Sequence, residues 1–293
     1  MHIILNLLFF FLFLLSCNQA PSNDPNTTDT TSILSKKELI QKKHLLNPNG
    51  KNLEKRVQTP NNFTRKEIVS PSFANYLRTL PLKPAESEVR YFDGTIKTNQ
   101  EVYDAVIDLP IGKKDLHQCA DAIMRLKAEY HWQQKEYDQI HFNFTNGFKV
   151  AYSEWRKGKK VIIEGNKTYW NNESKAATTY KDFWEYLELV FTYAGTSSLS
   201  KELKDMEIMQ MNIGDIFIQG GFPGHAVIVL DMAKQEATGE LLYLLGQSYM
   251  PAQEIQVLKN NQDQSISPWY RLHPTNRIFT PEWTFEATDL KRF

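Results

Sequence analysis

Apolar and polar residues are ordered most clearly in the last third of the chain, where they predict a group of β-strands. The stretch GDIFIQGGFPGHAVIVLD contains two short apolar runs, 215–219 and 225–231, on either side of a glycine-rich turn. A third strand is expected in GELLYLLGQSYMPAQ, where the apolar run 241–245 is followed by Gln247. In an antiparallel pairing with 225–231, the polar end of this strand returns to the end that begins with His225.

Helical spacing is found in two segments that precede these strands. In KKDLHQCADAIMRLKAEYHW, Asp115 is the expected N-cap, Gln118 completes a capping-box pattern, and apolar residues recur every three or four positions. Cys119 is therefore expected in the first turn of this helix. A second amphipathic helix is expected over 179–193, and Gly195 ends it.

Between these two helices, the stretch YDQIHFNFTNGFKVAYSEWRKGKKVII alternates apolar and polar residues around an Asn-Gly pair, which predicts a hairpin. Its aromatic side chains either line a cleft or belong to the core, and at least half are expected in the core. The candidate residues for a substrate cleft, here and near the predicted helix start and third strand, are Gln118, Asn143, Tyr152, Trp155 and Ser248.

The chain begins with an apolar run over 3–15, which is too short to span a bilayer comfortably. It predicts a signal peptide over 1–17, with an uncleaved anchor as the alternative. Residues 14–17 resemble the lipobox of bacterial lipoproteins. The resemblance implies that Cys17 carries lipid and that the protein is anchored to the bilayer of the bacterial cell envelope, facing the periplasm or the surface. Residues 18–58 are expected to form a flexible polar and basic tether, and 59–293 a single globular domain.

Composition narrows the classes of partner. The chain has 34 Lys and Arg residues against 34 Asp and Glu residues, and 12% of its residues are aromatic. A formal net charge of zero argues against electrostatic binding of nucleic acid, and the aromatic content favours a well-packed globule. The histidines and acidic residues near Cys119 do not have the spacing of a known metal motif, so we expect no metal site and no cofactor.

Only two cysteines are present, so Cys119 has no partner within the chain if Cys17 carries lipid. An unpaired thiol in an exported protein is either buried as a small apolar residue or kept for its reactivity. At a helix start, free backbone N–H groups and the helix dipole favour the thiolate, which predicts a thiol that ionises easily. Burial on the face that carries Ile123 and Leu126 is the alternative.

A lone histidine is more often structural than catalytic, yet His225 begins a strand in a chain that also carries an unpaired helix-start cysteine. We expect Gln247 to accept a hydrogen bond from one ring nitrogen of His225, so that the other nitrogen faces the thiol. A cysteine on a helix, a histidine on a strand and an amide on the next strand form the constellation of papain-like peptidases. The resemblance to these peptidases implies that Cys119 is the nucleophile, His225 the general base and acid, and Gln247 the orienting residue.

Two resemblances to known families add to this interpretation. Nearly all of the chain after about Ser70 resembles a family of bacterial lipoproteins known only as domain of unknown function 4846, through DLHQCADAIMRLKAEY, IHFNFTNGF, GDIFIQGGFPGHAVIVLDMA, LLGQSYMPAQ and PEWTFEATDLKRF. The GH-apolar strand that follows GD-apolar-apolar also resembles the histidine region of NlpC-type peptidases, which cut the peptide stems of peptidoglycan. Those enzymes have Asp-Cys-Ser-Gly at the nucleophile, whereas this chain has Gln-Cys-Ala-Asp, and 105 residues separate Cys119 from His225, more than is usual.

The expected fold is therefore α+β, with a papain-like, NlpC-type core in which the helix-start cysteine packs on an antiparallel sheet. The expected function is cysteine-dependent amide hydrolysis, with a peptidoglycan peptide as substrate. A non-catalytic lipoprotein that uses the same fold to bind envelope components is the alternative. Acyl transfer or thiol redox chemistry at the same cysteine is a third possibility.

Overall fold

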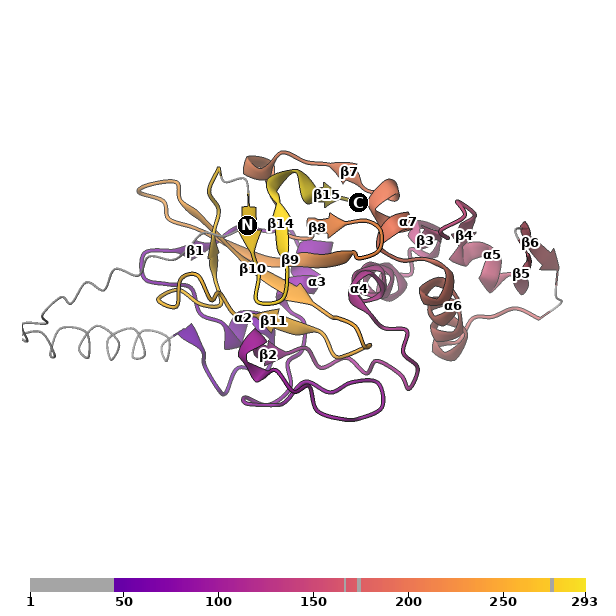
Figure 1. Ribbon diagram of the computed structural model, residues 1–293, viewed down its shortest axis with the longest axis horizontal. Helices are drawn as coiled ribbons and strands as arrows, with labels where there is room; N and C mark the ends of the chain where they lie inside the picture. The colour runs from indigo at the N-terminus through magenta and orange to yellow at the C-terminus, as the bar shows by residue number, and fades with distance from the viewer. Residues whose placement is uncertain (1–44, 166, 173–174, 275–276) are drawn as a thin grey trace, which may run out of the picture. The chain divides into compact units, whose positions relative to one another are not determined.

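The structure is a computed structural model that describes residues 45–165, 167–172, 175–274 and 277–293 (Figure 1). These residues belong to one compact unit, Glu38–Phe293. The predicted signal peptide, the predicted lipidation site Cys17 and most of the predicted tether lie outside the described residues. Within the described ranges, no helix combines the length and the apolar content needed to cross a membrane.

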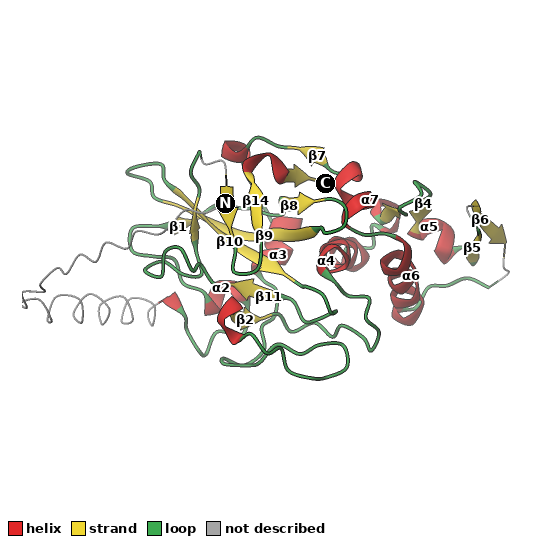
Figure 2. Cartoon of the chain, viewed as in Figure 1, coloured by secondary structure: helices red, strands yellow, loops and turns green. Residues whose placement is uncertain are grey.

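A large sheet, in which all pairings between described strands are antiparallel, forms the centre of this unit (Figure 2). Two strands, β1 (Thr64–Arg65) and β12 (Tyr270–Arg271), pair with β9 and β10 beside the main order of strands. The main order is β2 (Tyr103–Val106), β11 (Gln256–Leu258), β10 (Leu241–Gln247), β9 (His225–Lys234), β8 (Ile216–Gln219), β15 (Leu290–Arg292) and β7 (Lys204–Asp205).

Helices and three small hairpins complete the described chain. The helices are α2 (Leu53–Arg56), α3 (Phe73–Arg78), α4 (Cys119–Gln133), α5 (Tyr152–Arg156), α6 (Tyr180–Tyr193) and α7 (Thr196–Glu202). The hairpins pair β3 (His141–Asn143) with β4 (Lys149–Ala151), β5 (Lys159–Glu164) with β6 (Lys167–Asn172), and β13 (Arg277–Phe279) with β14 (Thr284–Glu286). Short 3-10 helices cover Gln100–Val102, Tyr137–Gln139, Ile208–Gln210 and Ala287–Asp289.

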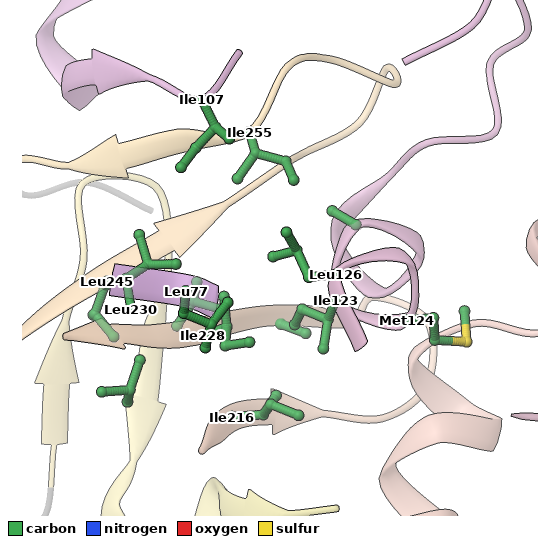
Figure 3. Close-up of a cluster of buried hydrophobic side chains, with 14 of the residues drawn as sticks. Leu77, Ile107, Ile123, Met124, Leu126, Ile216, Ile228, Leu230, Leu245 and Ile255 are labelled. Carbon is green, nitrogen blue, oxygen red and sulfur yellow. The ribbon is translucent and has the colours of Figure 1, made fainter. Parts of the chain in front are cut away.

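Strand β9 and helix α4 lie at the centre of the core and pack against each other. The strand is buried from its first residue to Ala233, and the helix is buried from Cys119 to Leu126. Ile123 and Leu126 of α4 lie in the same apolar cluster as Ile228 of β9 (Figure 3). Because a fully buried aliphatic side chain contributes about 1.5–3 kcal/mol, this cluster holds the start of α4 against the start of β9.

Most of the elements predicted between residues 140 and 250 are present. The three predicted strands correspond to β8, β9 and β10, and the predicted helix at 179–193 is α6, with Thr179 as its N-cap. The Asn146-Gly147 pair lies in the turn between β3 and β4, as predicted. Beyond this hairpin, α5 follows β4 directly and interrupts the alternation, which resumes as a strand in β5. The fold is α+β with an antiparallel main sheet, as predicted.

The globular part begins before the predicted boundary at residue 59. Leu45, Leu53 and Val57 are buried in the core, although they lie in the stretch predicted to be a tether. The indole N–H of Trp269 donates to the carbonyl oxygen of Gln58 over 2.8 Å, which fixes the end of this stretch. The prediction was wrong for the described part of the segment, because three apolar residues with distant partners outweigh its polar composition.

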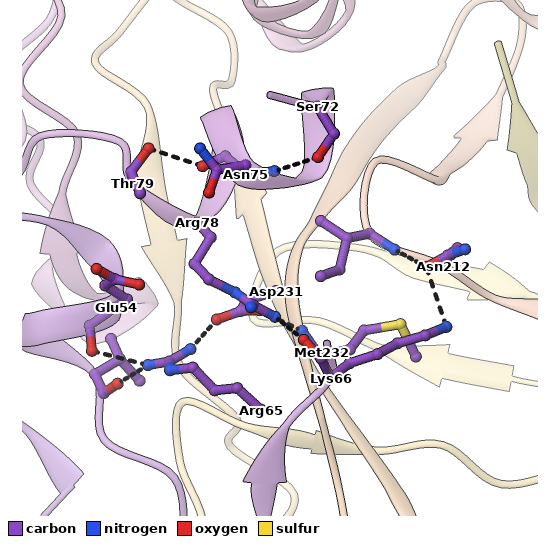
Figure 4. Close-up of polar contacts among 12 residues, drawn as sticks. Glu54, Arg65, Lys66, Ser72, Asn75, Arg78, Thr79, Asn212, Asp231 and Met232 are labelled. Carbon is purple, nitrogen blue, oxygen red and sulfur yellow. Dashed lines mark hydrogen bonds and ion pairs between the residues drawn. The ribbon is translucent and has the colours of Figure 1, made fainter. Parts of the chain in front are cut away.

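Asp231 is a fully buried acidic residue on β9 that lies against two arginines (Figure 4). Arg78 Nε donates to Asp231 Oδ1 over 2.8 Å, and Arg65 forms an ion pair with Oδ2. The backbone N–H of Met232 also donates to Oδ1 over 2.8 Å. Both carboxylate oxygens therefore have partners, which is what burial of an acidic side chain requires.

Candidate functional site

Helix α4 begins at Cys119, later than predicted, and its N-cap is Gln118. The backbone N–H of Gln118 donates to Asp121 Oδ2 over 3.0 Å. Asp115, the predicted N-cap, instead accepts hydrogen bonds from Gln118 Nε2 (3.1 Å) and from the backbone N–H of Ala252 (2.6 Å). Asp115 is bonded to the loop that contains Ala252, so the N-cap of α4 is Gln118 and not Asp115. Cys119 thus takes the first helical position, where backbone N–H groups have no partner inside the helix.

The first residue of β9 and the last residue of β10 meet at the same end of the sheet. The antiparallel register of the two strands pairs Gly246 with Ile228 and so brings Gln247 beside the start of β9. His225 Nε2 lies 2.9 Å from Gln247 Oε1. The hydrogen bond predicted between these two side chains is therefore present.

The neighbours of Gln247 fix the direction of this hydrogen bond. Gln247 Nε2 donates to Glu282 Oε2 over 2.6 Å. A carboxylate accepts hydrogen bonds, so the amide nitrogen must face Glu282 and the amide oxygen must face His225. His225 accordingly carries its proton on Nε2 and donates it to Gln247. The other ring nitrogen, Nδ1, has no hydrogen-bond partner in the described part of the chain.

Glu282 is held in turn by Lys97, a buried residue from a loop before β2. Lys97 Nζ donates to Glu282 Oε1 (2.7 Å) and Oε2 (2.9 Å), and also to Gln253 Oε1 (3.0 Å). A continuous set of contacts therefore runs from the imidazole of His225 through an amide and a carboxylate to a buried ammonium group. Such a chain restricts the rotation of each member.

Three aromatic rings surround the imidazole of His225. The ring centroids of Tyr249, Trp283 and Phe285 lie 4.6, 5.4 and 5.8 Å from that of His225. Burial lowers the pKa of His225 to about 4, and the charge of Lys97 acts in the same direction, while the hydrogen bond to Gln247 opposes both. The imidazole is therefore neutral near pH 7.

The thiol of Cys119 lies beside the backbone N–H of Ala226, the residue that follows His225, and beside the N–H of Ala120. Burial and, to a smaller extent, the nearby Asp121 raise the pKa of this thiol to about 11, although these N–H groups act in the opposite direction. The predicted easily ionised thiol is thus wrong for the resting protein, because burial outweighs the helix-start effect. No hydrogen bond joins the sulfur to the ring of His225 among the residues that the structure describes.

A pocket of about 210 Å³ opens at the start of α4, and Cys119 is part of its wall. The turn between β8 and β9 forms the opposite wall and lies close to α7. A β-carbon at Gly224 would lie 2.5 Å from Thr196 Oγ1, so this close approach requires glycine. The pocket is lined by Asp115, Leu116, Gln118, Cys119, Ala120, Asp121, Phe191, Ala194, Gly195, Thr196, Gly221, Phe222, Gly224 and Met250.

Of the five predicted cleft residues, Gln118 lines this pocket and the other four do not. Tyr152 and Trp155 are buried and pack against Tyr186, with ring centroids 5.0 and 6.0 Å apart. Asn143 lies on β3, where its backbone N–H donates to Glu202, outside the pocket. The aromatic residues were misassigned because alternation cannot distinguish a ring that lines a cleft from one that fills the core.

Ser248 is the remaining predicted cleft residue, and it is structural. Its side chain is buried, and its hydroxyl lies within hydrogen-bonding distance of the carbonyl oxygens of His117 (2.8 Å) and Gln253 (2.7 Å). These contacts join the loop after β10 to the residues before α4. In the described ranges, no three His, Cys, Asp or Glu side chains are arranged to hold a metal ion.

The sequence did not indicate a role in the site for Glu282, Lys97 or the aromatic neighbours of His225. The local signal for Glu282 is weak: a carboxylate between a proline and a tryptophan in the segment PEWTFE. Its partner Lys97 is 185 residues away, and no local pattern connects the two.

All residues of this site lie within the part of the chain that matches a known protein family. Residues 53–292, which include every residue of the set from Cys119 to Glu282, match the family described as domain of unknown function (4846). No curated protein and no solved structure matches the chain. The predicted resemblance to this family is thereby confirmed. The chain belongs to the family of domain of unknown function 4846.

Proposed function

We propose that this protein hydrolyses amide bonds with Cys119 as nucleophile, His225 as general base and acid, and Gln247 as the residue that orients His225. The observation that carries the proposal is an imidazole that is fixed through Nε2, has no partner at Nδ1 among the described residues, and lies next to a pocket lined by the thiol. An oriented nitrogen with a free lone pair is what proton transfer from a nucleophile requires. A papain-like core of the NlpC type is part of this proposal, supported by the cysteine on α4 and the histidine on β9.

In the proposed reaction, the sulfur of Cys119 attacks the carbonyl carbon while its proton passes to His225 Nδ1. Proton transfer accompanies the attack, because the resting thiol is protonated and the resting imidazole is neutral. Backbone N–H groups at the start of α4 donate to the oxygen that becomes negative. The C–N bond then breaks as His225 returns the proton to the leaving amine. Water hydrolyses the resulting thioester and releases the acid and the free thiol.

Peptide stems of the bacterial cell wall are the proposed substrate. The lipid anchor predicted at Cys17 would place the domain in the envelope, and the strand that begins with His225 resembles that of NlpC-type peptidases. The pocket of about 210 Å³ is smaller than the roughly 300–1,000 Å³ typical of sites for drug-sized ligands, which suits a short part of a peptide.

A non-catalytic, envelope-binding lipoprotein is the second candidate, and one observation favours it. Cys119 is only 8% exposed and its pKa is raised to about 11, which is the state of an inert core thiol. In that case the pocket would bind its ligand without a covalent step.

Two measurements on the full chain in detergent separate these candidates. The first is alkylation of Cys119 by iodoacetamide, followed by peptide mapping. The second is mass spectrometry of soluble cell-wall peptide stems after incubation. A hydrolase shows labelling of the folded protein that falls in His225→Ala but not in the exposed control His273→Ala, and cleavage that is lost in Cys119→Ser. A binding protein shows labelling only after unfolding, no cleavage, and the same affinity for the peptides in Cys119→Ser.

A further inference from the structure

We infer that the pocket beside Cys119 binds a protonated amino group of the substrate and that Asp121 is the acceptor for it. This inference rests on the proposed function, because it names the class of acyl donor that the hydrolase would take: a peptide with an ammonium group close to the scissile carbonyl.

The first observation is an unused acceptor. Asp121 is 6% exposed and lines the pocket. Its Oδ2 accepts the hydrogen bond from the backbone N–H of Gln118, but its Oδ1 is buried and has no hydrogen-bond partner in the described ranges. Buried carboxylate oxygens are normally paired, so an unpaired one in a pocket wall indicates a missing donor.

The second observation is the charge of the pocket. The described residues that line it include two acidic side chains, Asp115 and Asp121, and no lysine, arginine or histidine. Asp115 is already engaged with Gln118 and Ala252, which leaves Asp121 as the acceptor with spare capacity. A pocket with negative groups and no cation of its own favours a cationic ligand.

The direction of the pKa shift of Asp121 agrees with a carboxylate that lacks a charge partner. Burial raises its pKa well above the usual value, and the neighbouring charge of Asp115 acts in the same direction, while the hydrogen bond from Gln118 opposes both. An ammonium group in the pocket would supply both a charge partner and donors for Oδ1. A divalent metal ion is less suitable, because the described residues provide no set of three ligands here.

The position of Asp121 limits where the amino group lies. It lies in the first turn of α4 together with Cys119, both residues line the same pocket, and its charge acts on the thiol. A group bound to Asp121 is therefore near the carbonyl that the sulfur attacks. Phe222, which is 95% exposed, and Met250 are apolar members of the same pocket and would contact an adjacent side chain of the peptide.

The test compares alkylating agents of similar size and different charge at Cys119 of the full chain, with peptide mapping to exclude Cys17. The probes are 2-bromoethylammonium, iodoacetamide and iodoacetate, and each rate is divided by its rate with N-acetylcysteine to remove intrinsic reactivity. We expect a preference of at least tenfold for the ammonium probe over iodoacetamide, and an opposite effect for iodoacetate. Asp121→Asn, which keeps an oxygen for Gln118, should reduce the preference to near one, and Asp115→Asn should reduce it less.

The possible outcomes separate this inference from the proposed function. Labelling by iodoacetamide without any preference for the ammonium probe overturns the inference and leaves the hydrolase intact. An unreactive thiol with all three probes in the folded protein overturns both. If Asp121→Asn does not fold, protection of wild-type Cys119 from iodoacetamide gives the same answer: alaninamide should protect and N-acetylalaninamide should not, and equal protection by both overturns the inference.

Discussion

Strand β9 carries a buried polar residue toward each end, and the structure surrounds these two residues in opposite ways. Asp231 has both carboxylate oxygens occupied, by Arg78, Arg65 and a backbone N–H. His225 has one ring nitrogen bonded to Gln247, and the other has no partner in the ranges that the structure describes. Cationic groups contact the acidic residue directly, whereas the nearest cation in the histidine network is separated from the ring by an amide and a carboxylate.

This difference distinguishes a structural polar group from a candidate reactive one. A fully partnered buried group contributes to a unique fold, because it is costly to place elsewhere. A ring nitrogen that has no partner in the described part of the chain brings no such benefit. The chain nevertheless fixes His225 with a network and three aromatic rings, which is the behaviour expected of a site where local rules give way to function.

The largest expected effect comes from removing the imidazole. His225→Ala should lower the rate of peptide cleavage by about 10²–10⁴-fold, because the proposed general base and acid is lost. Cleavage is measured by mass spectrometry of released amines at several substrate concentrations. The exposed His273→Ala is the matched control and should retain the wild-type rate. A change of less than tenfold in folded His225→Ala protein would argue against the assigned role.

Removing the charge of Asp231, which lies toward the other end of β9, should lower the stability of the fold. Asp231→Asn leaves Arg65 and Arg78 without their counter-charge, so we expect the free energy of unfolding to fall by about 3–5 kcal/mol. Urea denaturation followed by tryptophan fluorescence measures this change. Asp205→Asn removes the acidic partner of the exposed ion pair with Lys291 and should have little effect. Equal losses in both variants would contradict the structural role of Asp231.

Acidification should reveal the cost of keeping His225 neutral. Its pKa in the folded protein is lowered from 6.5 to about 4, so the unfolded chain binds a proton first as the pH falls. Stability is therefore lost between about pH 6.5 and pH 4, by about 3 kcal/mol from this residue. His117, whose pKa is lowered to about 3, acts in the same direction, and Asp121, whose pKa is raised, acts in the opposite one.

Urea denaturation at several pH values in this range measures the slope. His225→Asn should make the slope shallower than in the wild type without removing it, because His117 remains. An unchanged slope would show that the ring of His225 is protonated as easily in the folded protein as in the unfolded chain.

The smallest effect is expected from changing the orienting residue. Gln247→Ala leaves His225 Nε2 and Glu282 without their shared partner, at a cost of about 1–3 kcal/mol, so cleavage should fall by roughly tenfold to a hundredfold. Nitrogen NMR should show loss of the single Nε2–H tautomer, which a purely structural role would not change. Glu282→Gln should have a weaker effect, since its amide oxygen still accepts from Gln247.

The parts of the site that local patterns determine could be predicted from the sequence. The strands that begin at His225 and end at Gln247 follow from apolar runs and a glycine-rich turn, and their antiparallel pairing predicted the hydrogen bond between the two side chains. The position of Cys119 at a helix start followed from capping signals, although the cap moved to Gln118. Periodicity and turn chemistry are local properties, and they determined these elements.

The rest depends on contacts between distant segments. Lys97 and Glu282 have no shared local pattern, so the network behind Gln247 could not be predicted. The ionisation of Cys119 was predicted in the wrong direction, because the helix-start effect is local whereas burial depends on how α4 packs against β9. The segment before residue 59 was misread for the same reason, since the burial of Leu53 depends on residues far along the chain.

The link between Lys97 and Glu282 also bears on how the site comes into being during biosynthesis. The two residues are separated by 185 positions, and translation at about 5–20 residues per second adds that length in roughly 10–40 s. For most of this interval, from the addition of Cys119 onward, the nascent chain contains the thiol but not the carboxylate that orients the amide beside the histidine. A nascent or truncated chain therefore carries the cysteine without the oriented imidazole, and the proposed hydrolysis requires the last hairpin to dock first.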